Sequence, residues 1–318
     1  MRKFLWSLVL LLTLISCKND EKKKIDVSHI VTDTKVARFE VDFYNTSEET
    51  LPELKKKYPL FFPHNVDSVW INKINNTDEQ ELFKETQKIY SNFSPLEKQI
   101  NSLFQHIKYY NPEFIEPLVV TTISNIDYNN RVLYTGDYLI ISLDVYLGKD
   151  HEFYGDYPLY VKTNNTKEHI IVDVANAIVS KQIKPSVKRT FIEKMIAEGK
   201  KMYVLDMYLP NESDREKIGY AINKFAWIQA NEEGVWRYFI EKDLLYSTDS
   251  KLNKRFLDIA PFSKFYLESD VETPGRVGVW IGWQIVRAFM KNNDVSLREL
   301  MQMNAEEIFK KSKYKPRK

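Results

Sequence analysis

The stretch Ile170-Ile171-Val172-Asp173-Val174-Ala175-Asn176-Ala177-Ile178-Val179-Ser180 decides the fold class predicted for this chain. A helix through it would carry two opposite stripes of side chains. The polar stripe would contain Asp173, Asn176, Ala177 and Ser180, and the apolar stripe Ile171, Val174, Ala175 and Ile178. Because β-branched residues are frequent here, a buried strand remains the alternative. We expect a mostly buried helix whose polar stripe faces inward.

A short block of strands is predicted before this helix. Residues 116–123, 132–134 and 138–142 are rich in β-branched and aromatic residues, and Thr135-Gly136-Asp137 supplies a turn between the last two. Apolar and polar residues also alternate over 36–43, which predicts a half-buried strand there. The sheet that these strands form is expected to be small, and antiparallel or mixed.

Helices account for most of the remaining chain. We expect helices at 51–58, from Thr77 onward and at 94–110, the last two opened by capping signals. Beyond residue 167 the pattern is helical throughout, with helices expected at 167–182, 187–207, 213–230, 232–242, 253–258, 275–291, from 296 and at 305–311. The predicted fold class is therefore α+β and mainly helical.

A sheet followed by a mostly buried helix is also the setting in which zincin metalloproteases place His-Glu-x-x-His. The two histidines of that motif bind zinc and the glutamate polarises a water molecule. In this register the chain reads Val172-Asp173-Val174-Ala175-Asn176. Valine has no donor atom, Asn176 is a poor zinc ligand, and Asp173 is a shortened form of the general base. We therefore expect a zincin-like architecture that has lost its zinc ligands, with no metal and no catalytic residue.

Glu198 follows on the next helix, at the spacing of the third, carboxylate ligand of the gluzincins. One carboxylate without two imidazoles does not compete for zinc. The alternative is a structural glutamate that faces Lys200 or Lys201, and this alternative is favoured.

The N-terminus has the pattern of an export signal. Residues 1–16 combine a basic start with a short apolar run, and the only cysteine of the chain, Cys17, follows directly. Leu14-Ile15-Ser16-Cys17 resembles the lipobox of bacterial lipoproteins. That resemblance implies cleavage before Cys17 and a diacylglycerol and a fatty acyl group, such as palmitate, on this residue, with no other cofactor. Two acyl chains or more suffice for a stable membrane anchor. Residues 17–30 would hold the lipidated cysteine and a flexible tether.

Charge argues against nucleic acid as a partner. The full chain has a formal net charge of +2, and removing the signal takes away Arg2 and Lys3. A surface that is close to neutral gives no electrostatic support for binding a polyanion. Lys18, at the second mature position, is not the aspartate that commonly retains lipoproteins in the inner membrane. The outer membrane is therefore favoured as the site of anchoring.

Three segments together resemble the GldB family, the gliding motility lipoproteins of Bacteroidetes. They are the lipobox, residues 171–179 and residues 271–286, and residues 311–316 resemble the end of that family. The resemblance implies a part in gliding and in the linked type IX secretion machinery. It also implies kinship with a predicted zinc protease domain in which the His-Glu-x-x-His helix is intact.

In such relatives the segment around Pro274-Gly275-Arg276 lies near the substrate cleft. We therefore consider Arg276, Trp280 and Trp283 as cleft or partner residues, since a guanidinium binds carboxylates through its planar fork. The alternative is that Gly278 and Gly282 serve helix packing and that Arg276 pairs with a structural acid. Asp67-Ser68-Val69 matches a short O-glycosylation pattern at Ser68, although a three-residue match is weak.

The expected organisation is a signal peptide at 1–16, the lipidated cysteine and tether at 17–30, a mostly helical region at 31–115 and a zincin-like domain at 116–318. We expect a lipid-anchored protein of the cell envelope that acts by contact with other gliding and secretion proteins, without catalysis. The alternatives are a divergent metallopeptidase that uses Asp173 and Glu198, and a lipoprotein that binds glycans through exposed aromatic side chains.

Overall fold

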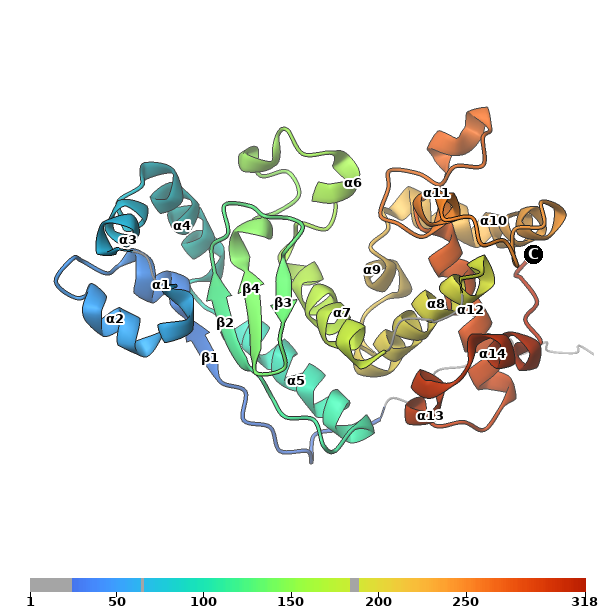
Figure 1. Cartoon of the computed structure of the whole chain (residues 1–318), viewed down its shortest axis with the longest axis horizontal. Coiled ribbons are helices and arrows are strands. Elements are labelled where there is room, and N and C mark those ends of the chain that lie inside the picture. The colour runs from blue at the N-terminus through green and yellow to red at the C-terminus, as the bar shows by residue number, and fades with distance from the viewer. Residues whose placement is uncertain (1–24, 64–65, 184–188) are drawn as a thin grey trace, which may run out of the picture.

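A small mixed sheet lies at the centre of the molecule (Figure 1). The computed structural model describes residues 25–63, 66–183 and 189–318. In the order β1-β2-β4-β3, the first three strands are parallel, and β3 pairs antiparallel with β4. The strands are β1 (Val36–Arg38), β2 (Leu118–Thr122), β3 (Val132–Tyr134) and β4 (Tyr138–Ser142). The predicted α+β class, mainly helical with a small sheet, is confirmed.

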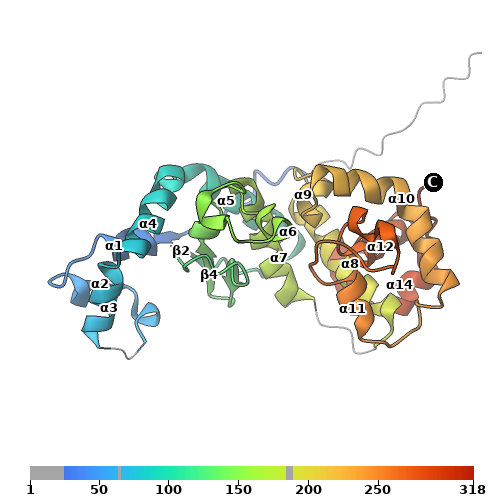
Figure 2. The same cartoon turned by 90° about the horizontal axis from the view of Figure 1, so that it is seen from above.

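Both faces of this sheet are buried, each in a different core. Val119 and Leu139 belong to the larger core, whereas their neighbours Val120 and Ile140 pack in a second, smaller one. Successive residues of a strand point to opposite faces, so this alternation separates the two cores. Helices α5 (Ser94–Tyr110) and α7 (Ile170–Gln182) contribute to the larger core. The smaller core is built mainly from α1 (Phe39–Tyr44), α2 (Leu51–Lys57), α3 (Asp67–Ile74) and α4 (Thr77–Tyr90), which lie together at one end of the molecule (Figures 1 and 2).

The strand predicted at 36–43 is wrong beyond residue 38, where the chain turns into helix α1. The buried residues of this helix, Phe39, Glu40, Phe43 and Tyr44, recur at helical rather than alternating spacing. Glu40 is fully buried and accepts a hydrogen bond from Arg38 Nε at 2.7 Å and one from Thr121 Oγ1. The alternating pattern of 36–43 gave a wrong prediction because Glu40, a charged residue, lies on the core face, where it pairs with Arg38.

Helices make up the rest of the chain, as expected (Figure 2). They are α8 (Phe191–Tyr208), α9 (Asp214–Ile218), α10 (Ile222–Glu241), α11 (Lys251–Phe256), α12 (Val277–Asn292), α13 (Leu297–Gln302) and α14 (Ala305–Ser312). The break predicted between 230 and 232 lies instead at Gly219, whose φ of +73° caps α9 in the left-handed conformation. Within the described ranges, no helix is both long and apolar enough to cross a bilayer.

Helices α8 and α12 cross at unusually short range through two glycines. A Cβ atom built on Gly282 would lie 1.8 Å from the carbonyl oxygen of Met195, and one on Gly199 would lie 2.2 Å from the carbonyl oxygen of Gly282. Only glycine permits backbones to approach this closely. The structure thus supports the packing role considered for Gly282. Because α12 begins next to Arg276, this crossing also determines where that side chain lies.

Candidate binding cleft

The polar stripe of helix α7 lines a cavity of about 670 Å³. Asp173, Asn176, Ala177 and Ser180 all contribute to its wall, as the sequence predicted. The opposite stripe is buried in the larger core, together with Val172, whose exposure is 0%. The segment is helical over Ile170–Gln182, so the alternative of a buried strand is excluded.

Asp173 is held by three side chains from different elements. Tyr146, just after β4, donates a hydrogen bond from Oη to Asp173 Oδ2 at 2.8 Å. Arg131, just before β3, places Nη1 3.8 Å from the same oxygen. His169 lies one turn before Asp173, with Nε2 3.5 Å from Oδ1. The carboxylate is therefore fixed between the sheet and α7.

These contacts change the ionisation of both partners. Burial acts to raise the pKa of Asp173, but His169, Arg131 and Tyr146 favour the anion and hold this pKa below its usual range. Burial likewise acts to lower the pKa of His169, but the carboxylates of Asp173 and Glu216 overcome it and raise the pKa to about 9. At neutral pH the site contains an imidazolium and a carboxylate.

This charge state limits the chemistry available here. An imidazolium has no lone pair to offer a metal ion, and a carboxylate that balances two cations is a weak general base. In the part of the chain that the structure describes, no three His, Cys, Asp or Glu residues group in a way that could hold a metal ion.

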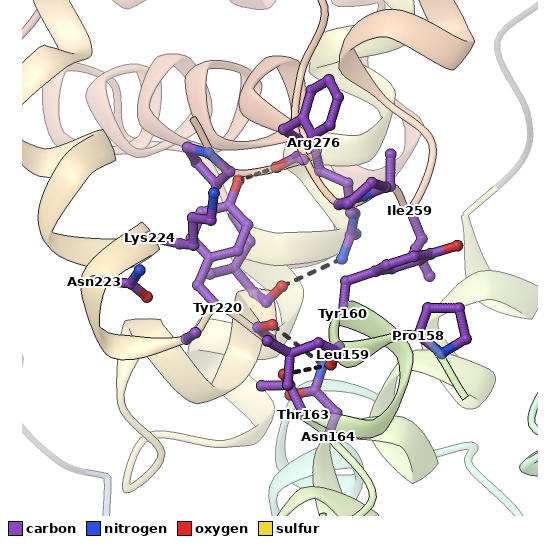
Figure 3. Close-up of a pocket in the computed structure, with 18 of the residues that line it drawn as sticks. Pro158, Leu159, Tyr160, Thr163, Asn164, Tyr220, Asn223, Lys224, Ile259 and Arg276 are labelled. Carbon is purple, nitrogen blue, oxygen red and sulfur yellow. Dashed lines mark hydrogen bonds between the residues drawn. The ribbon is translucent and has the colours of Figure 1, made fainter. Parts of the chain in front are cut away.

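A second cavity of about 590 Å³ adjoins the first. The two share part of their lining, so we describe them as the polar arm and the apolar arm of one cleft. The shared residues are Tyr160, Asn164, Ile218, Gly219, Ile259 and Arg276. Figure 3 shows the apolar arm, with Arg276 in the midst of residues from α6 (Leu159–Lys162), the start of α10 and the segment before α12.

Arg276 is thus placed in the cleft, as the sequence suggested. It is the N-cap of α12 and has a left-handed backbone with φ of +60°. That conformation costs a non-glycine residue on the order of 1 kcal/mol. Nη1 donates to the carbonyl oxygen of Ile218 at 3.4 Å. Among the described residues, no carboxylate lies within ion-pair distance of this guanidinium. The described residues therefore do not supply the structural acid that we considered as the partner of Arg276.

Trp280 and Trp283 lie in the core of the helical half. Trp283 donates its indole N–H to Asp206 and Trp280 donates to Glu232, each at 3.0 Å, and both side chains are almost fully buried. Trp280 also lines a separate cavity of about 470 Å³ near the C-terminal segment. The packing of these two tryptophans fixes the position of α12 and therefore the position of Arg276, its N-cap, in the cleft.

The remaining predicted sites lie away from the cleft. Glu198 is on α8, where its Oε1 pairs with Lys201 Nζ at 2.7 Å, as the structural alternative had it. Ser68 lies exposed in the first turn of α3, a position that leaves its hydroxyl accessible. Cys17 lies outside the described residues.

Sequence reasoning missed the partners of Asp173. His169 could have been found, because a histidine four residues before an aspartate lies on the same face of a helix. Arg131 and Tyr146 gave no local signal, since they reach Asp173 only through the folding of the sheet against α7.

Comparison with known protein families gives a match over most of the chain. The model of a family described as gliding motility protein GldB matches residues 20–316, nearly the whole chain. No curated protein matches, and no solved structure matches. The zincin-like architecture expected for residues 116–318 therefore stays a prediction.

Proposed function

This chain belongs to the family of the gliding motility protein GldB, and from that premise we propose that it is a lipid-anchored, non-catalytic binding component of the gliding apparatus. The proposal includes the secretion machinery linked to gliding, whose proteins would be its partners. The cleft beside α7 would provide the binding surface.

The observation that carries the non-catalytic part is the state of Asp173. In the zincin register expected from the sequence, Asp173 has the place of the general base, yet its oxygens are occupied by Tyr146 and His169 and faced by Arg131. At the first histidine position, Val172 has an apolar side chain in the core. Residues that once could have served hydrolysis would now shape and stiffen the wall of a binding cleft.

The anchor rests on the sequence at Cys17 and on the family, whose name designates lipoproteins. With two or three acyl chains on one residue, binding to a membrane becomes stable, because each buried methylene contributes about 0.8 kcal/mol. Because Lys18 is not the aspartate that commonly retains lipoproteins in the inner membrane, we propose the outer membrane as the site of anchoring. The part of 17–30 before residue 25 would then act as the tether, whereas 25–30 belong to the folded chain, since Val27 is buried and Ile30 accepts a hydrogen bond from Gln105.

Cys17→Ala is expected to abolish lipidation, because alanine offers no thiol to the acyl donor. The protein should then keep its signal segment or leave the membrane fraction, and gliding should be lost. Cell fractionation with immunoblotting measures the first effect, and colony spreading measures the second. Lys18→Arg is the matched control and should stay in the membrane at normal size. If Cys17→Ala remains membrane-bound and processed to the normal size, the lipid anchor is refuted.

A further inference from the structure

The side chains that line the apolar arm of the cleft carry positive charge and no negative charge, although Glu272, outside the lining, acts on Lys224 through its charge. The charged lining residues of this arm are Lys224 and Arg276, and both are cationic. Lys224 Nζ donates to the carbonyl oxygens of Val271 at 2.6 Å and Thr273 at 2.8 Å, which are neutral acceptors. A concave site lined by one sign of charge attracts ligands of the opposite sign.

Arg276 differs in its partners from four of the five other part-buried arginines in the described residues; the fifth, Arg255, donates to the carbonyl oxygen of Lys264 and to the hydroxyl of Tyr238. A carboxylate lies within 4.0 Å of the guanidinium in Arg38, Arg131, Arg215 and Arg287. Arg276 uses one donor, for the carbonyl oxygen of Ile218, and keeps a left-handed backbone that places its side chain in the cleft. A guanidinium has five donors in a planar fork that matches a carboxylate. The remaining donors are therefore suited to an anion from outside the chain.

The walls around Arg276 are apolar and open to solvent. Leu159 is 71% exposed, Ile259 72% and Val271 62%, and all three line the apolar arm. Exposed apolar side chains gathered around a concave site are typical of an interaction surface. The adjoining polar arm offers Asn176 and Ser180 as hydrogen-bonding groups. Because the two cavities share six lining residues, one extended chain can reach both arms.

We propose that this cleft binds an extended segment of a partner protein in which an aspartate or glutamate is flanked by apolar residues. The acidic side chain would pair with Arg276, and the apolar neighbours would contact Leu159, Ile259 and Val271. This inference rests on the proposed binding function and specifies the chemistry of its partner.

The test is a selection of short random peptides, displayed on phage, on the purified full chain in detergent. We expect enrichment of peptides that carry an acid between apolar residues. For the best such peptide, Arg276→Gln should weaken binding by about tenfold or more, because a charge-assisted pair is lost. Arg276→Lys should retain part of the affinity. Arg298→Gln, which removes an exposed arginine on α13, is the matched control and should bind normally.

Val271→Glu is a second variant, which we expect to fold normally because the residue is exposed. It should weaken the binding of acidic peptides, because it places a negative charge beside their acidic side chain. The proposal is overturned if no acidic motif is enriched, or if Arg276→Gln and Val271→Glu bind the selected peptides as the wild type does. It is also overturned if the binding of sodium dodecanoate, titrated in parallel, depends on Arg276 and the binding of the peptides does not. None of these outcomes affects the anchor at Cys17 or the absence of catalysis, which have separate tests.

Discussion

Replacing Gly282 with alanine is expected to lower the free energy of unfolding by about 3 kcal/mol or more. The added Cβ would lie 1.8 Å from the carbonyl oxygen of Met195 and 2.5 Å from its carbonyl carbon. These are backbone atoms of helix α8, so the clash is relieved only if α8 and α12 move apart. That movement would open the core around Trp283 and displace Arg276 at the start of α12. Urea denaturation of the full chain, followed by circular dichroism, measures the effect.

Gly234→Ala is the matched control for this substitution. Gly234 lies inside helix α10, and a Cβ there would meet nothing within 4 Å. Because glycine is a poor helix former, alanine should stabilise the protein by about 0.5–1 kcal/mol. A Gly282→Ala protein that is absent from the detergent-solubilised fraction while Gly234→Ala is present also agrees with the expectation. Equal stability of Gly282→Ala and the wild type would show that the close crossing is not needed.

Asp206→Ala is expected to cost about 3–5 kcal/mol of stability, because it leaves the buried ammonium of Lys217 without its counter-ion and Arg287 with Asp214 alone. Asp206 is fully buried on α8. It accepts from Arg287 Nε and Nη2 at 2.7 Å each, from Lys217 Nζ at 3.0 Å and from the indole of Trp283 at 3.0 Å. The network joins α8, α9 and α12. Since Lys217 and the residues after it line the cleft, its loss should also loosen the polar arm.

Asp294→Ala serves as the control, because Asp294 is exposed and should change stability by about 0.5 kcal/mol or less. The melting temperatures of both variants and of the wild type, measured by thermal unfolding, test this expectation. A melting temperature of Asp206→Ala that matches that of Asp294→Ala would mean that the buried network adds no stability.

Local periodicity predicted the helices well, because their burial repeats at helical spacing. Helix α7 shows this most clearly, since its two stripes separate the cleft wall from the core. Strands β3 and β4 were found because a turn at Gly136, with φ of +106°, joins two short β-branched runs. The misplaced break in 213–242 has a different cause. Gly219 ends α9 through its left-handed conformation, whereas Gly234 is tolerated in mid-helix, and a sequence does not distinguish the two.

The parts of the candidate site that the sequence offered are local. Asp173 and Asn176 follow from one helix, and Arg276 was considered because the family resemblance implies a cleft near its segment. The cleft itself depends on α6, α9 and the segment around Ile259, which converge from distant parts of the chain. Trp280 and Trp283 were considered for the cleft from the same resemblance. Their hydrogen bonds to Glu232 and Asp206 in the core are tertiary contacts, which the sequence does not show.

The zinc content of the purified full chain tests the central claim most directly, since a binding cleft and a protease differ in their need for metal. The protein would be isolated without chelators, equilibrated with zinc, desalted and analysed by plasma mass spectrometry. We expect zinc far below one ion per chain, unchanged by Asp173→Asn or Glu198→Gln. About one tightly held zinc ion per chain, lost in both variants, would contradict the account and favour a metallopeptidase.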